Sequence, residues 1–232
     1  MKKDRPRPKS GDRRHSRSSS VEARAATPAP PRPIPDSPNP PKPGGFHRWL
    51  FLLLALLLLT GQWVLAVDSL QRENPTIDEV IHLPAGVSYW ERGTFRLYPH
   101  NPPLIKLMAA WPVVRAQPKT EALYRMASWN LAIPDKARFG HEFMFFNAAS
   151  FLDQMTAARL MMPPWAVLGG VVVLVWSTQL FGRLGGLLSL SLWTFCPNIL
   201  AHARLVTTDV GATALGAGAT WLFVMLARSG RW

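Results

Sequence analysis

Two adjacent carboxylates, Asp78 and Glu79, lie in the first polar segment after a long apolar run. Thr76 and Glu79 fit the capping box, in which a threonine and a glutamate three residues later bond each other's backbone. The pattern predicts a helix with both acids in its first turn. Acids there stabilise the helix dipole, but one could also take a proton from a reacting hydroxyl. His82 lies one turn after Asp78 on the same face and could hydrogen-bond it. As a metal site, the pair Asp78 and His82 lacks a third ligand.

A stiff corner follows this helix, which is expected to bend at Pro84 and to end at Gly93. The corner is His100-Asn101-Pro102-Pro103-Leu104, where two prolines favour extended backbone and remove donors. Residues 104–114 then read as a short apolar helix, too brief to cross a bilayer and expected to lie in its interface. Lys106 within it is expected to extend towards lipid headgroups. The segment 117–140 shows no pattern with a chemical role.

Long uncharged runs indicate an all-α polytopic membrane protein, because about 20 apolar residues cross a hydrocarbon core. Four runs qualify: Trp49–Val67, Leu160–Phe181, Leu184–Ala201 and Val210–Ala227. The second and third are separated by only Gly182 and Arg183, which predicts an antiparallel helical hairpin. The small residues that begin the fourth run would let a neighbouring helix approach closely.

The basic residues predict the orientation. Residues 1–48 hold twelve Lys and Arg against four Asp and Glu and few large apolar residues, so this Pro-rich tail is expected to be disordered. The tail, Arg183 and the C-terminal arginines fall on one side when the spans are threaded in order, and the positive-inside rule makes that side cytoplasmic. The first loop, 68–159, is then extracytoplasmic. Six charged or titratable residues share that face: Asp78, Glu79, His100, Lys106, Arg159 and Asp209.

Composition argues against several other classes of protein. The single cysteine, Cys196, excludes an internal disulfide framework. No aromatic residue precedes Phe46, so the basic tail has no means of stacking on bases, and a nucleic-acid partner is not expected. A transporter would place charges or broken helices near mid-membrane, whereas the predicted spans are uncharged inside.

The order of these features resembles a known family. Asp78-Glu79 follows a first span, then come His100-Asn101-Pro102-Pro103-Leu104-Ile105-Lys106, Ala158-Arg159 at the next span, and Arg204-Leu-Val-Thr-Thr-Asp209 after a hairpin. This order is similar to the N-terminal part of the lipid-carrier-dependent glycosyltransferases of the C-type fold. Protein O-mannosyltransferases (family 39) and aminoarabinose transferases belong to that family. Relatives have more spans, so this chain is expected to be a piece of one or a short member.

The resemblance implies inverting transfer of a sugar from a polyprenyl phosphate to an acceptor hydroxyl, on a protein or a glycolipid. It implies that Asp78 is the catalytic base, with Glu79 beside it, and that Arg159, His100 and Lys106 bind the donor phosphate. Asp209 matches a further acidic position. Asn101 stands where some relatives have a phosphate-binding lysine, so that cation is missing here. No cofactor is implied, and a need for a divalent metal is left open. The alternative is a non-catalytic membrane protein that binds lipid-linked sugar or serves as a subunit.

Overall fold

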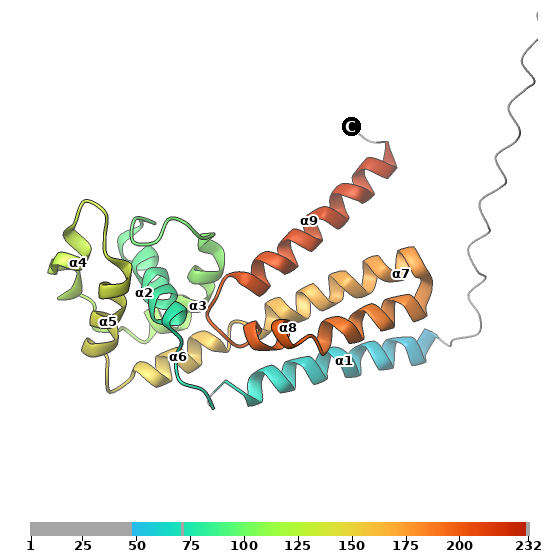
Figure 1. The fold of residues 1–232 in the computed structure, drawn as a ribbon, viewed down its shortest axis with the longest axis horizontal. Coiled ribbons are helices and arrows are strands. Elements are labelled where there is room, and N and C mark those ends of the chain that lie inside the picture. Colours follow the sequence, from blue (N-terminus) through green and yellow to red (C-terminus); the bar gives the residue numbers. More distant parts are fainter. Residues whose placement is uncertain (1–47, 71, 231–232) are drawn as a thin grey trace, which may run out of the picture. The chain divides into compact units, whose positions relative to one another are not determined.

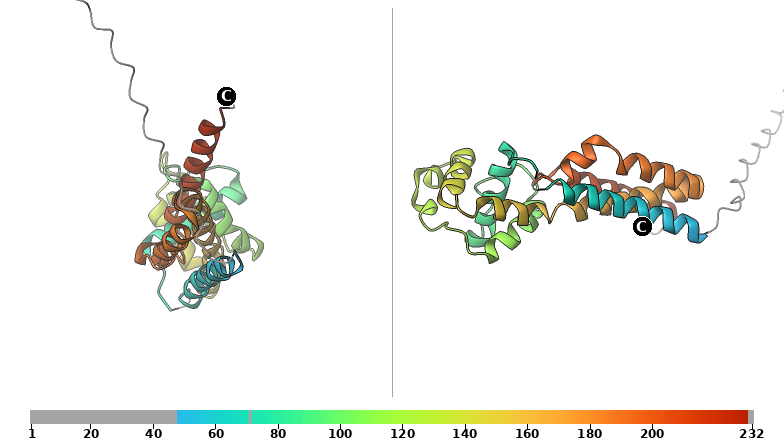
Figure 2. Two further views of the ribbon diagram at one scale, coloured as in Figure 1. Left: turned by 90° about the vertical axis from the view of Figure 1, so that its right-hand side faces the viewer. Right: turned by 90° about the horizontal axis from the view of Figure 1, so that it is seen from below.

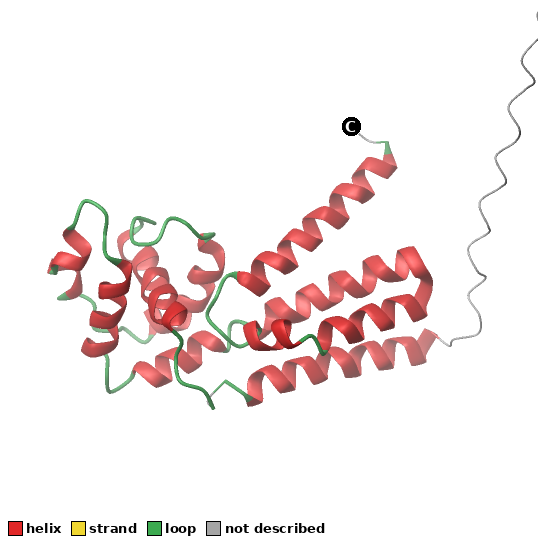
Figure 3. Cartoon of the chain, in the orientation of Figure 1, coloured by secondary structure: helices red, strands yellow, loops and turns green. Residues whose placement is uncertain are grey.

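The computed structural model describes residues 48–70 and 72–230, which form helices and connecting turns and no strand (Figure 3). The predicted disordered tail therefore lies outside the described residues, apart from Arg48. In chain order the elements are α1 (Arg48–Asp68), α2 (Ile77–Arg92), α3 (Pro103–Arg115), the 3₁₀ helix η1 (Leu123–Arg125), α4 (Ala127–Asn130), α5 (Lys136–Phe146), α6 (Phe151–Arg159), α7 (Pro163–Thr194), α8 (Pro197–His202) and α9 (Asp209–Ser229) (Figure 1).

Three helical stretches are long and apolar enough to cross a membrane: α1, the stretch Phe151–Thr194 and α9. The all-helical class and the presence of membrane-length helices are thus as predicted, but three stretches qualify where four separate runs were expected, because the second and third runs lie in one continuous stretch. Most large apolar side chains of α1, such as Leu52, Leu56 and Leu57, lie on the protein surface and are not covered by other residues, as expected of a surface that faces lipid.

Helix α7 folds back on itself at Gly182, as the short Gly-Arg connection predicts (Figure 1). The backbone there has φ 75° and ψ −178°, a conformation that only glycine adopts readily. The two arms of α7, residues 163–181 and 183–194, run antiparallel. The second arm is shorter than the predicted run Leu184–Ala201, because Cys196 takes an extended conformation before Pro197 and the chain restarts as α8.

Helix α1 lies beside α7 (Figure 2) and packs against both of its arms, with a small apolar core between the three. Its buried members are Ala55, Leu174, Leu187 and Leu190. Helix α9 follows the first arm of α7 in a parallel direction: Ala214 lies beside Gly169, and further along Trp221 Nε1 donates to Gln179 Oε1 at 2.9 Å. Alternating helix directions of this kind are what a chain that crosses a layer repeatedly requires.

The connecting region, which we define as residues 69–162 between α1 and α7, supplies most of a larger core, to which the adjoining ends of α1, α7 and α9 also contribute. Helix α2 packs on α3 and α5, and α3 packs on α6. The fully buried side chains include Leu83, Val113, Phe139, Phe143 and Met155. Each contributes roughly 1.5–3 kcal/mol by burial. At Gly86 a Cβ atom would lie 2.2 Å from the carbonyl oxygen of Lys106, so only glycine lets α2 and α3 approach this closely.

Local signals in the sequence account for the helix ends in this region. Helix α2 begins at the predicted capping box, continues through Pro84 and ends at Gly93, which has a left-handed conformation. Pro103 occupies the first position of α3, where its missing N–H leaves no bond unmade. Asp135 caps α5 by accepting from the N–H of Arg138. These signals fix the N-terminal turns of α2, α3 and α5, which carry Asp78 and Glu79, Lys106 and Lys136.

Candidate functional site

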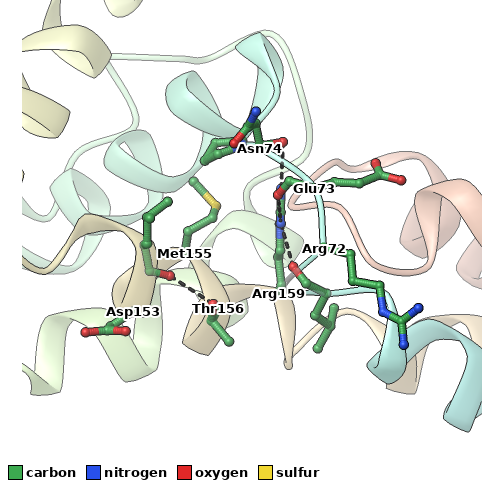
Figure 4. Close-up of a pocket in the computed structure, with 10 residues that line it drawn as sticks. Arg72, Glu73, Asn74, Asp153, Met155, Thr156 and Arg159 are labelled. Carbon is green, nitrogen blue, oxygen red and sulfur yellow. Dashed lines mark hydrogen bonds between the residues drawn. The ribbon is translucent and has the colours of Figure 1, made fainter.

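Glu79 and Arg159 form a buried ion pair between the first turn of α2 and the end of α6. Arg159 donates from Nη2 to Oε2 at 2.6 Å and from Nε to Oε1 at 2.7 Å, and the side chains are 4 % and 0 % exposed. Its other N–H groups donate to the carbonyl oxygens of Leu70, Glu73 and Asn74 in the loop after α1 (Figure 4). An arginine has five N–H donors, and all five are occupied here.

This arrangement gives Arg159 a structural role that the sequence did not predict. The guanidinium ties the α1–α2 loop and α2 to the end of α6, and the two-point geometry fixes its orientation. The role implied by the resemblance, binding of the donor phosphate, would require some of these bonds to break first.

The carboxylate of Glu79 is as fully bonded as its partner. Beyond Arg159, it accepts from the N–H of Thr76 at 2.9 Å, which completes the predicted capping box, and from the N–H of Val206 at 3.1 Å. Burial alone would raise the pKa of this carboxyl. The hydrogen bonds from Arg159, Thr76 and Val206 and the charge of Arg159 outweigh it and lower the pKa. Glu79 is therefore held ionised and has no lone pair directed at a substrate.

A hollow of about 320 Å³ lies beside the guanidinium of Arg159 (Figure 4). Its walls come from the α1–α2 loop and from α6, and they mix charges of both signs. The lining residues are Leu70, Arg72, Glu73, Asn74, Pro75, Leu152, Asp153, Met155, Thr156 and Arg159. Since the arginine at its base is already saturated, the hollow offers an entering anion only Arg72, which is itself paired with Asp68 at 2.8 Å.

The loop between α8 and α9 is fastened to α2 through both sides of one residue, Val206. Its N–H donates to Glu79, and its carbonyl oxygen lies 3.0 Å from Nδ1 of His82. A carbonyl can only accept, so Nδ1 of His82 carries the proton and Nε2 is an acceptor, which Asn101 approaches at 3.4 Å. Burial and, to a lesser degree, the charge of Lys106 lower the pKa of His82. The bond to Val206 replaces the predicted one to Asp78.

Asp78 and Asp209 approach the same histidine from different elements. The charges of both carboxylates act on His82 and raise its pKa against the larger effect of burial. Asp209 pairs with His202, whose Nδ1 lies 3.2 Å from its carboxylate. Asp78 is exposed and, within residues 48–70 and 72–230, forms no hydrogen bond or ion pair. The structure thus brings these two predicted site acids to one cluster, and Asp78 is the one whose oxygens are unoccupied.

The prediction that Lys106 extends towards lipid headgroups is wrong, because its side chain turns inward. It is 1 % exposed, and its Nζ donates to the carbonyl oxygens of Tyr98 at 2.9 Å and Asn101 at 3.0 Å. Burial lowers the pKa of Lys106 to about 8, and the charge of Lys136 acts in the same direction. His100, the other predicted phosphate ligand of this corner, is exposed, and its ring centroid lies 6.2 Å from that of Tyr98.

Sequence reasoning missed Lys136 and Tyr98. Lys136 begins α5, and its Nζ stands 3.7 Å from the centroid of the Tyr98 ring. His82 stacks on the same ring, with centroids 5.2 Å apart. The cap at Asp135 signals the start of α5, but no local pattern tells that this helix returns to the corner at Tyr98.

The predicted site residues therefore divide into two groups. Glu79 and Arg159 are joined in the buried ion pair, whereas Asp78, His100, Lys106 and Asp209 surround His82 and Tyr98. In the described part of the chain, no three His, Cys, Asp or Glu side chains are grouped closely enough to hold a metal ion. Comparisons of the chain with family models, curated proteins and solved structures gave no match.

Proposed function

We propose that this protein transfers a glycosyl group from a polyprenyl-phosphate sugar to an acceptor hydroxyl, with inversion and with Asp78 as the base. One observation carries the proposal: of two adjacent carboxylates at the start of α2, Glu79 is wholly bonded to the protein, whereas Asp78 is exposed and unbonded. The resemblance in motif order supplies the reaction class. Glu79, although named beside Asp78 by that resemblance, acts here as a positioning residue for α2 and for Val206.

The chemistry matches the groups around Asp78. The acceptor oxygen attacks the anomeric carbon while its proton passes to the Asp78 carboxylate, and the bond from that carbon to the phosphate oxygen breaks with its electron pair staying on the phosphate. Proton removal by a positioned carboxylate contributes about 10²–10⁴ in rate. Cations near the leaving phosphate stabilise its growing charge.

The proposed topology has four passes: α1, the two arms of α7 with α8 extending the second, and α9. The turn at Gly182 and Arg183 would then face the cytoplasm with the N-terminal tail, and the connecting region would be extracytoplasmic, on a cell (inner or plasma) membrane. A donor whose prenyl chain lies in the bilayer would meet Asp78 at the outer membrane surface. Acceptor protein or glycolipid would approach from the same side.

Sugar transfer from radiolabelled polyprenyl-phosphate mannose, in membranes that contain the Asp78→Asn variant, tests the proposal. We expect a loss of about 10²–10⁴ in rate without loss of folded protein. Asp153→Asn is the matched control, since Asp153 is also an exposed acid in the first turn of its helix, α6. Equal activity of the Asp78→Asn variant and the wild type would remove the base and the proposed reaction with it.

A second function, non-catalytic binding of lipid-linked sugar as a subunit of a larger assembly, is favoured by the saturation of Arg159. An arginine whose five N–H groups all bond to the protein is suited to holding segments of the chain together, and it has no free donor for a substrate. Under this alternative the purified chain would bind polyprenyl-phosphate mannose, release no product, and be indifferent to Asp78→Asn.

A further inference from the structure

Two lysines from different helices meet at the ring of Tyr98. The Nζ of Lys106, from α3, is 4.4 Å from the ring centroid, and the Nζ of Lys136, from α5, is 3.7 Å from it. Each contact with the ring face is a cation–π interaction. The two ammonium groups also repel one another, and this repulsion adds to the burial that lowers the pKa of Lys106.

Neither lysine has an acidic partner in the part of the chain that the structure describes. Lys106 donates to two carbonyl oxygens, and an ammonium has a third N–H. Lys136 is half-buried, and its ammonium group lies over the ring without a hydrogen bond or ion pair to any other described side chain. Like charges held together at a partly buried site are unfavourable unless an anion joins them.

Tyr98 adds a hydrogen-bond donor beside the two charges. Its hydroxyl oxygen accepts from Asn101 Nδ2 at 3.4 Å. Among the described residues, no group accepts the hydroxyl proton, which is therefore available to a ligand. Tyr98 and Lys136 are both half-buried, whereas Lys106 is 1 % exposed, so a ligand can reach the first two side chains and not the third. Lys106, behind them, acts through its charge.

We propose that Lys136 and Tyr98 bind the phosphate of the lipid-linked substrate, that Lys106 neutralises it from behind the ring, and that the lysine pair favours the doubly charged product. This inference rests on the proposed function. A sugar phosphodiester carries one negative charge. When its bond to the anomeric carbon breaks, the electron pair stays on the phosphate oxygen, and the released monoester carries close to two charges at neutral pH. Two lysines match the second state, so they stabilise the charge that develops during transfer.

Binding of small phosphate esters to the full chain, in phosphatidylcholine nanodiscs at pH 7, tests the site without turnover. We expect calorimetry to show that butyl phosphate, a monoester, binds about tenfold tighter than dibutyl phosphate, a diester, since bonds to charged groups are the stronger ones. Lys136→Ala should weaken binding of the monoester about tenfold and remove the preference, and Lys136→Arg should retain both. Tyr98→Phe, which keeps the ring, should also weaken binding.

Lys119→Ala is the matched control, because Lys119 is an exposed lysine of the same region whose hydrogen bonds to Asn147 are made by its backbone. Equal affinity for the two esters, or an unchanged affinity in Lys136→Ala, would overturn the proposal. If butyl phosphate no longer binds when the chain is placed in nanodiscs that contain phosphatidylglycerol, the site is assigned to lipid headgroups. That result would also overturn the proposal.

The two proposals fail separately. Ester binding that depends on Lys136, together with sugar transfer that is absent, would refute the enzyme and leave the phosphate site. Sugar transfer that requires Asp78 but is indifferent to Lys136→Ala would refute this site and leave the enzyme.

Discussion

Glu79 and Arg159 stand 80 residues apart in the chain, and their side chains meet in a two-point ion pair closed to solvent. The pair joins four segments, because Glu79 lies in α2 and Arg159 in α6, Arg159 also holds the α1–α2 loop, and Glu79 also holds Val206 ahead of α9. Both residues carry functional roles in the resemblance described above. In the structure they position α2, which carries Asp78, and the loop through Val206 that leads to Asp209 at the start of α9.

Arg159→Ala should destabilise the protein severely. It leaves Glu79 as an uncompensated buried charge and frees three carbonyl oxygens, and loss of one partner of a buried pair costs about 3–5 kcal/mol. Thermal unfolding in detergent, followed by circular dichroism, measures the loss. Arg72→Ala is the control, because Arg72 pairs with Asp68 at the exposed surface and such pairs contribute about 0–1 kcal/mol. Similar melting temperatures for the two variants would contradict the structural role of Arg159.

Acid should unfold the protein through Glu79. The pKa of this carboxyl is lowered in the folded state, so between that value and the ordinary one near 4.5 the unfolded chain binds more protons than the folded chain. The stability that Glu79 contributes is therefore fully present above about pH 4.5 and is lost as pH falls through the folded-state pKa. We expect melting temperatures measured from pH 6 to pH 3 to fall more steeply for the wild type than for Glu79→Gln. Parallel curves for the two proteins would contradict this.

The sequence predicted those features whose signals are local. Uncharged runs predicted the membrane-length helices, the Thr76–Glu79 spacing predicted the cap of α2, and a glycine between two apolar runs predicted the hairpin at Gly182. Each depends on residues within one or two turns of one another, where backbone geometry and hydrophobic period decide the structure. The break at Phe195 and Cys196 was within reach of the same rules, because Pro197 disfavours helical backbone before it.

The direction of the charged side chains was not predictable in this way. Lys106 was expected at headgroups because it lies on a short apolar helix, yet the close packing of α3 on α2 at Gly86 leaves it inside, bonded to carbonyls of the preceding corner. Arg159 was expected to bind phosphate because the resemblance implies that role, and no local pattern showed that Glu79, in another helix, occupies it. Lys136 had no predicted role. The directions of these three side chains depend on which helices, distant in the sequence, pack together. The spacing of residues within one segment does not contain that information.

Alkaline pH should stabilise the protein through Lys106. Its pKa is lowered to about 8 from 10.5, so between these values the unfolded chain binds the extra proton and stability rises with pH. The shift corresponds to about 3 kcal/mol between pH 8 and 10.5. The titratable or charged groups that face Lys106 are Lys136, Tyr89, Tyr98 and His82.

Of these, Tyr89 has a pKa raised by burial and stays neutral across the window, and His82 is already neutral. Melting temperatures from pH 7.5 to 10.5, compared with those of Lys106→Met, measure the contribution. The methionine variant should lack the rise that the wild type shows. An equal rise in both would show that another group is responsible.

Gly182→Ala should weaken the hairpin of α7. At φ 75° and ψ −178° an alanine side chain is strained, and a residue held in such a conformation costs about 1–3 kcal/mol. Gly216→Ala is the control: Gly216 lies inside α9, a Cβ there meets no atom within 4 Å, and alanine in a helix interior is favoured by about 1 kcal/mol. The melting temperature in detergent should therefore fall for Gly182→Ala and hold or rise for Gly216→Ala. If Gly182→Ala melts with the wild type, the turn adopts another conformation, and the antiparallel pairing of the two arms of α7 at this residue is wrong.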